Sequence, residues 1–347
     1  MRIALGQLPD ATPELLAFAR QLGLSSVQLN TPALPGESEW SHADLIALRR
    51  RCEAAGLVLE AIENLPNAFY ERTMLGLPGR DEELDHVCAT IRNLGTAGIP
   101  VLGYHFMPAS VWRTSIATEG RGGAIVTAYD HALAIDPRRA DEVYVARRDK
   151  RLADPFVRAD HFADGVELDD EAMWANYRYF LEAVVPVAEE AGVRLALHPD
   201  DPPVPALAGI ARLFRSVDNL ERAMDVVPSP SSGLDLCLGT VSEMGGETAV
   251  LRAIETFGPR GQIVYVHLRD VRGTVPAFAE CFLDEGNYDP LRVLAALRAV
   301  GFDGFILDDH VPRLIGDTDY MHRGRAHAIG FIQGLLRGLG STASGQA

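Results

Sequence analysis

The sequence has almost no lysine. Its 347 residues include a single one, Lys150, which lies in a charged run at residues 147–151. A Schiff-base aldolase needs a lysine held in an apolar, desolvated setting, because only a neutral amine is nucleophilic. A lysine flanked by aspartate and arginine does not meet this requirement. The composition therefore argues against Schiff-base chemistry.

Long apolar runs, closely spaced cysteines and excess positive charge are also missing. No stretch approaches the roughly 18 apolar residues of a membrane span, and the first residues lack the pattern of a signal peptide. The net charge of −16 argues against nucleic acid or an anionic membrane as a partner. The four cysteines are far apart and form no CxxC pair: Cys52, Cys88, Cys237 and Cys281. We therefore expect a reduced, cytoplasmic protein that acts on a small molecule.

Short apolar segments alternate with helical patterns along the whole chain. Eight segments are typical of buried strands: roughly residues 3–7, 26–29, 58–62, 100–105, 193–198, 233–237, 262–268 and 304–308. Apolar residues recur at helical spacing in seven others: 12–22, 41–55, 81–97, 172–191, 246–257, 290–300 and 325–338. The alternation predicts an α/β fold, a (β/α)₈ TIM barrel. An open doubly wound sheet is the alternative, but the first strand is not followed by a glycine-rich phosphate turn.

One interval is too long for the simple repeat. Residues 107–171 separate the fourth predicted strand from its helix, and a connection of this length is usually functional or disordered. Because it leaves from the carboxyl end of a strand, we expect it to cover the active face as a lid. The sequence thus predicts one domain over residues 1–338, with a flexible tail at 339–347.

Four residues of metal-ligand type stand at the ends of four successive predicted strands: His198, Cys237, His267 and Asp309. Each alone is more often structural, as a packed histidine, a small buried cysteine or a helix-capping aspartate. Their equivalent positions favour a shared role, since the carboxyl ends of barrel strands converge on one face. Mixed nitrogen, sulfur and oxygen donors suit Mn²⁺, Fe²⁺, Co²⁺ or Zn²⁺.

Other polar residues are close to these four in the sequence. Asp200, Asp201 and Asp235 could hold a ligand in place or could simply cap a turn. His310 directly follows Asp309, so we expect it beside the metal. A histidine titrates near neutral pH in solution, which makes His310 a candidate general acid or base.

Several longer motifs resemble the mannonate dehydratase family, metal-dependent sugar-acid lyases built on a xylose-isomerase-like barrel. They are YHFMP (104–108), GGAIVTAYD (122–130), HPDDPP (198–203), HLRDV (267–271) and DEGNYD (284–289). The resemblance implies that His198, Cys237, His267 and Asp309 bind Mn²⁺ or Fe²⁺. It implies that His310 is catalytic, and that D-mannonate loses water to give 2-keto-3-deoxy-D-gluconate.

This chemistry needs one group to remove the C2 proton and another to protonate the departing C3 hydroxyl. His310 is the candidate for one role. The family's second acid/base group is a tyrosine near residues 324–326, and Tyr320 is the nearest one here. Arg113 and Arg269 are candidates for binding the substrate carboxylate, with structural salt bridges as the alternative. The expected pocket-lining residues, for which packing at the barrel mouth is the alternative, are Tyr104, His105 and Trp112.

The chain also departs from the family pattern. Some members have Arg-Pro-Asp-His where this sequence has Leu307, Asp308, Asp309 and His310, so one basic group is missing. A dehydratase of another aldonic or uronic-type sugar acid is therefore one alternative. Others are a metal-dependent sugar isomerase or epimerase, with Glu60 and Glu63 as candidate acid/base groups, and a sugar-acid binding protein without catalysis. Barrels of this kind often pair, which leaves a homodimer or higher homo-oligomer open.

Overall fold

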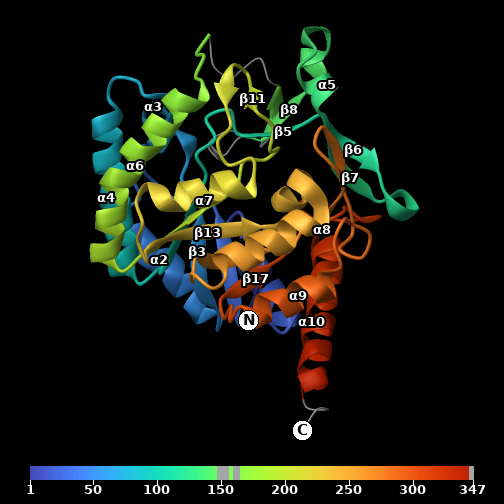
Figure 1. Cartoon of the computed structure of the whole chain (residues 1–347). Coiled ribbons are helices and arrows are strands. Elements are labelled where there is room, and N and C mark those ends of the chain that lie inside the picture. The colour runs from blue at the N-terminus through green and yellow to red at the C-terminus, as the bar shows by residue number, and fades with distance from the viewer. Residues whose placement is uncertain (147–155, 159–164, 344–347) are drawn as a thin grey trace.

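Eight parallel strands close into a barrel in the computed structural model, which describes residues 1–146, 156–158 and 165–343 (Figure 1). In order around the barrel they are β1 (Arg2–Leu8), β2 (Ser26–Asn30), β3 (Val58–Glu63), β4 (Val101–Tyr104), β10 (Arg194–Leu197), β13 (Ser232–Cys237), β14 (Ile263–His267) and β17 (Phe305–Leu307). Each coincides with one of the eight predicted segments. The predicted TIM barrel is confirmed.

The helices alternate with these strands along the chain. The long ones are α1 (Pro13–Gln21), α2 (His42–Ala54), α4 (Arg80–Ala97), α6 (Asp170–Ala191), α7 (Val217–Val226), α8 (Leu238–Phe257), α9 (Pro290–Ala299) and α10 (His322–Ala343). Side chains that accept a backbone N–H begin several of them, for example Thr12, Ser41 and Asp169. Helix α7 and the short α3 (Glu71–Leu75) were not predicted.

One layer of the barrel interior is filled by aromatic and small apolar side chains. Tyr265 and Phe305 stack with ring centroids 4.9 Å apart, among Ala4, Ala61 and Ala196. Because side chains alternate along a strand, the residues two positions beyond Ala61, Ala196 and Tyr265 share their inward face, and these are polar: Glu63, His198 and His267. The candidate site therefore lies next to a layer of tightly packed apolar side chains.

Two excursions leave the carboxyl ends of the barrel strands. The first follows β4 and contains β5 (Val111–Arg113), β6 (Ser115–Glu119), β7 (Ile125–Asp130), β8 (Tyr144–Ala146) and β9 (Phe156–Arg158). The second follows β14 and contains β15 (Val271–Thr274) and β16 (Ala277–Glu280). They share an antiparallel sheet, β15-β16-β7-β6, and Figure 1 shows β5 and β8 at the end of the barrel opposite the tip of α10.

The sequence predicted only the insertion after β4. The structure adds the second excursion, whose strands pair with those of the first. Residues 147–155 and 159–164 of the predicted lid, including Lys150, lie outside the described residues. Lid closure stays a prediction. Within the described ranges, no helix is both long and apolar enough to cross a membrane.

Helix α10 continues to Ala343, so the first residues of the predicted tail are helical. The flexibility of the tail stays a prediction. Leu339 is buried against the core, and Arg298 donates a hydrogen bond to its carbonyl oxygen at 2.8 Å. These contacts hold the last turns of the helix although the segment is rich in glycine and serine. Residues 344–347 lie outside the described residues.

Candidate metal centre and catalytic site

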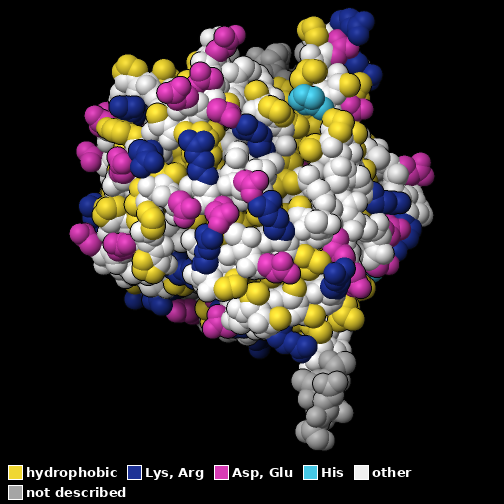
Figure 2. Space-filling view, viewed as in Figure 1, with side chains coloured by type: hydrophobic (Ala, Val, Ile, Leu, Met, Phe, Trp, Pro, Cys, Tyr) yellow, Lys and Arg dark blue, Asp and Glu magenta, His cyan; other side chains and the backbone are white. Residues whose placement is uncertain are grey.

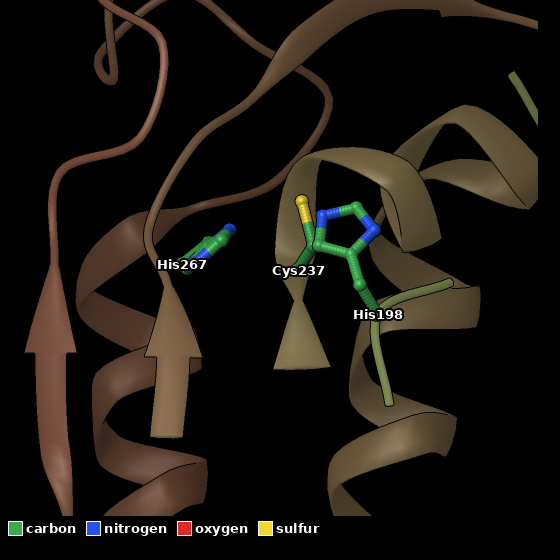
Figure 3. Close-up of side chains that lie close together, drawn as sticks. All are labelled: His198, Cys237 and His267. Carbon is green, nitrogen blue, oxygen red and sulfur yellow. The ribbon is translucent and has the colours of Figure 1, made fainter. Parts of the chain in front are cut away.

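The four predicted metal ligands lie together at the carboxyl ends of the barrel strands. Ligand atoms of His198, Cys237 and His267 all lie within 4.8 Å of one another. Asp309 completes the group, with Oδ2 3.9 Å from the Cys237 sulfur and 3.7 Å from His267 Nδ1. All four side chains are buried. Figure 3 shows the sulfur of Cys237 between the two imidazole rings. This buried cluster could hold a metal ion.

Hydrogen bonds select which nitrogen of each histidine is available. Nδ1 of His198 lies 2.6 Å from the carbonyl oxygen of Pro199, so Nδ1 donates and Nε2 is the nitrogen available to bind a metal ion. Nε2 of His267 lies 3.0 Å from Oε2 of Glu63, which leaves Nδ1 as the free nitrogen. That Nδ1 is buried and has no hydrogen-bond partner in the described part of the chain. A buried unpaired nitrogen is costly unless a ligand satisfies it, as a metal ion would.

The charge around Cys237 favours a thiolate. Burial by itself would raise the pKa of the thiol, but Arg269 and His198 lower that pKa well below its ordinary value. Thr240 adds two hydrogen bonds to the sulfur, from its backbone nitrogen at 3.5 Å and from its hydroxyl at 3.3 Å. A thiolate is the form of cysteine that binds metal ions.

Two carboxylates lie close to Nε2 of His267, Asp235 from the adjacent strand β13 and Glu63 from β3 on the far side of the barrel. Glu63 accepts hydrogen bonds from Gln28 at 2.6 Å and from Gln7 at 3.1 Å, which fix it beneath the imidazole ring. Asp235 has one oxygen 3.3 Å from His267 Nε2, and burial raises the pKa of Asp235 well above its ordinary range. Of the three aspartates proposed to support a ligand, Asp235 is thus the one next to a ligand ring.

His310 lies at the rim of the cluster and is the most exposed of these groups. Its Nδ1 is 2.6 Å from Oε1 of Glu280, and its Nε2 is 3.7 Å from Oδ1 of Asp309. Glu280 belongs to β16, in the excursion that was not predicted, so sequence reasoning missed it. Burial raises the pKa of Glu280, but His310 and Arg113 lower it further, to about 2. Glu280 is therefore ionised at neutral pH.

Arg113 and Arg269 are paired with protein carboxylates. Arg113 makes a two-pronged contact with Asp201 at 2.6 and 2.8 Å and reaches Glu280 at 2.9 Å. Arg269 contacts Glu243 at 2.7 Å, and Asp201 and Glu280 at 3.2 Å each. Both guanidinium groups are 1% exposed. The structural salt bridge, which was the alternative for both arginines, is thus present. A substrate carboxylate would have to displace an internal partner.

Other predicted substrate-binding side chains are engaged with the scaffold. The Tyr104 hydroxyl lies 3.1 Å from the hydroxyl of Tyr177, and the indole N–H of Trp112 donates to the carbonyl of Ala109 at 2.6 Å. Nδ1 of His105 accepts the backbone N–H of Met107 at 3.2 Å. These contacts correspond to packing at the barrel mouth, the alternative given for all three residues.

Tyr320 lies near β1. Its hydroxyl donates to the carbonyl of Gly6 at 2.8 Å, and its ring packs against Phe18 and under Arg325. The hydrogen bonds and ring contacts described for Tyr320 do not include His310 or the four clustered ligands. A role as the second acid/base group has no support in this arrangement.

The fold and the buried His, Cys, His and Asp cluster define a TIM-barrel protein with a candidate metal centre. A family model for D-mannonate dehydratase (UxuA) matches residues 10–345. The chain is 35% identical over 320 residues to a mannonate dehydratase of Thermotoga neapolitana, covering 87% of each sequence. The chain therefore belongs to the D-mannonate dehydratase family.

Solved structures agree with this assignment. The crystal structure of mannonate dehydratase from Streptococcus suis serotype 2 is similar with a TM-score of 0.80 and 28% identity, covering 96% of this chain and 93% of that one. A D-psicose 3-epimerase from Clostridium cellulolyticum H10 gives a TM-score of 0.61 at 14% identity, covering 97% and 99%. The second likeness concerns the fold alone.

Proposed function

We propose that this protein removes water from D-mannonate to give 2-keto-3-deoxy-D-gluconate, using one bound Mn²⁺ or Fe²⁺ ion. The observation that carries the proposal is the meeting of His198, Cys237, His267 and Asp309 beside His310 in a member of this family. The substrate would be a small anionic sugar acid, because a bound metal ion and nearby arginines can attract it locally although the chain has a net charge of −16. On the face drawn in Figure 2, basic side chains are interspersed with acidic and hydrophobic ones.

The donor set fits a first-row transition ion. Two imidazoles, a thiolate and a carboxylate match Mn²⁺ or Fe²⁺ better than Mg²⁺ or Ca²⁺, which prefer oxygen ligands. The unpaired Nδ1 of His267 is the atom that most requires such an ion. When bound, the ion would act as a Lewis acid toward the negative charge that develops on the substrate carboxylate.

His310 is the candidate for moving a proton. With Nδ1 donating to Glu280, the free lone pair is on Nε2, the nitrogen on the side of Asp309. In the reaction the C2–H bond breaks, a C2=C3 double bond forms, and the C3 hydroxyl leaves as water; the enol then becomes the 2-keto acid. Nε2 would either take the C2 proton or, once protonated, give a proton to the leaving hydroxyl.

The isomerase alternative depended on a pair of free glutamates. Glu60 is paired with Arg2 at 3.1 Å and accepts a hydrogen bond from Ser26. Glu63 is held against His267. These contacts favour a dehydratase over a two-glutamate isomerase, and they leave the identity of the sugar acid to experiment.

A substrate panel tests the proposal. Mn²⁺-loaded protein is incubated separately with D-mannonate, D-gluconate and D-fructose, and 2-keto-3-deoxy acids and isomerised ketoses are both measured. We expect keto acid from D-mannonate, lost in His310→Asn and retained in His42→Asn, because His42 is exposed on α2 far from β17 in the sequence. Ketose interconversion without keto acid would reject the proposal. If keto acid forms from D-gluconate alone, D-gluconate replaces D-mannonate as the proposed substrate.

The cytoplasmic location and the homo-oligomeric state stay predictions. Cys237 can bind a metal ion only while its sulfur is reduced, and this requirement supports a reducing compartment. Sedimentation of the purified protein would measure its native mass.

A further inference from the structure

Four buried charged residues close a ring beside the candidate catalytic histidine: Arg113, Asp201, Arg269 and Glu280. Asp201 and Glu280 each contact both arginines, at 2.6 to 3.2 Å. Arg113 comes from β5 in the first excursion and Glu280 from β16 in the second, while Asp201 and Arg269 follow β10 and β14. The ring thus ties both excursions to the barrel at one point, and His310 touches it there.

Two members of this ring compete for one atom of His310. Oε1 of Glu280 lies 2.6 Å from His310 Nδ1, and Nη1 of Arg269 lies 2.9 Å from the same Nδ1. An ionised carboxylate can only accept and a guanidinium can only donate, so the two contacts demand opposite states of Nδ1. The contact with Glu280 is the shorter one. Nη1 of Arg269 also has Asp201 and Glu280 itself as acceptors.

We propose that Glu280 is a positioning residue that fixes the tautomer of His310. It keeps the proton on Nδ1, so that the lone pair of Nε2 faces the cluster at Asp309. Without the carboxylate, Arg269 would donate to Nδ1 and the ring proton would move to Nε2, where it blocks the function as a base. The proposal rests on the role given to His310 under the proposed function.

The surroundings of Glu280 make the idea testable by chemical rescue. Glu280 is one of the residues that line a surface cavity of about 410 Å³, together with Thr118, Glu119, Arg121 and Arg272. We expect a small anion to enter from this cavity the space that a shortened side chain at position 280 would leave. Glu119 lines this cavity from an exposed position and supplies a matched glutamate for comparison.

The experiment compares Glu280→Gln, Glu280→Asp and Glu280→Ala with Glu119→Gln in the full-length, Mn²⁺-loaded protein. We expect kcat for keto-acid formation to fall about 10-fold or more in Glu280→Gln and Glu280→Ala, and by no more than the ~10²–10⁴ that a general acid or base contributes. KM should change little, Glu280→Asp should keep more activity, and Glu119→Gln should match wild type. Formate should restore part of the Glu280→Ala rate, whereas neutral formamide should not.

A second readout does not depend on turnover. In protein with isotope-labelled histidine, loaded with diamagnetic Zn²⁺ because Mn²⁺ would broaden the signals of a nearby ring, NMR shifts distinguish the two tautomers, and His310→Asn identifies the signals of His310. We expect the Nδ1–H form in wild type and the Nε2–H form in Glu280→Gln, with equal metal content. An unchanged tautomer in Glu280→Gln overturns the proposal, as does a wild-type kcat in that variant. If wild type forms no keto acid, the proposed function fails, while the tautomer measurement still decides the role of Glu280.

Discussion

Nε2 of His267 lies 3.0 Å from Oε2 of Glu63, at the inner end of the candidate metal centre. The contact leaves the other ring nitrogen for Cys237 and Asp309, so we expect Glu63 to orient a ligand rather than to bind the ion itself, although Glu63, Asp235 and His267 also lie close enough together to hold one. Glu63 ends β3 on the far side of the barrel, 204 positions away along the chain.

Glu63→Gln should weaken Mn²⁺ binding by about 10- to 100-fold, the usual cost of losing the partner that orients a metal-bound histidine. The affinity is measured by calorimetric titration of metal-free protein. Glu60→Gln is the matched control, because Glu60 lies on the same strand but contacts Arg2 and Ser26. Equal affinities in both variants would show that Glu63 does not orient the ligand.

Cys237→Ser should remove most of the thermal stabilisation that Mn²⁺ gives the protein. A ligand that binds only the folded state stabilises it by RT ln(1 + [L]/Kd), so a large loss of affinity appears as a smaller shift in Tm. Cys88→Ala serves as the control, since Cys88 lies on α4 and its thiol faces the carbonyl of Ala183. An undiminished shift in Cys237→Ser would remove this cysteine from the site.

Metal affinity should rise with pH. Burial lowers the pKa of His198, but the Cys237 thiolate raises it to about 9 in the metal-free protein. Below that pH the ion must displace a proton from His198, so its apparent affinity should increase about tenfold per pH unit up to about pH 9. Titrations in buffers of different ionisation enthalpy would count the released proton. Constant affinity between about pH 6 and 8 would contradict the raised pKa.

The same shift affects the stability of the metal-free protein, with a definite sign. Because the folded pKa of His198 lies above the unfolded value of about 6.5, its contribution to stability is complete below about pH 6.5. That contribution is lost as the pH rises toward about 9. Urea unfolding of metal-free protein across this range measures the loss.

Asp201→Ala should destabilise the fold by about 3–5 kcal/mol, because it leaves Arg113 and Arg269 buried with one partner fewer. Urea unfolding of the metal-loaded protein gives the free energy. The exposed pair Arg49–Glu53 provides a comparison, and Glu53→Ala should cost only about 0.3–0.5 kcal/mol. A loss under about 1 kcal/mol in Asp201→Ala would mean that the ring does not support the two excursions.

The barrel and the four clustered ligands could be predicted because both follow from local patterns. Strand and helix periodicities are read within about ten residues, and the ends of parallel strands must converge. His198, Cys237 and His267 therefore needed no long-range information to be brought together.

The buried ring of charges could not be predicted in the same way. Arg113 meets Asp201 and Glu280 across 88 and 167 positions of sequence. These long-range contacts depend on the antiparallel pairing of β16 with β7. No local sequence pattern specifies this pairing between the two excursions. For the same reason the sequence left open whether Arg113 and Arg269 bind a substrate or form internal salt bridges, and the structure shows the internal pairs.

The most direct test of the central claim is the rate at which D-mannonate is converted to 2-keto-3-deoxy acid as Mn²⁺ is added to metal-free protein. We predict no turnover without the ion, saturation at one ion per chain, and no turnover at any Mn²⁺ concentration in His310→Asn. A rate that is independent of added metal, or that survives in His310→Asn, would contradict the account.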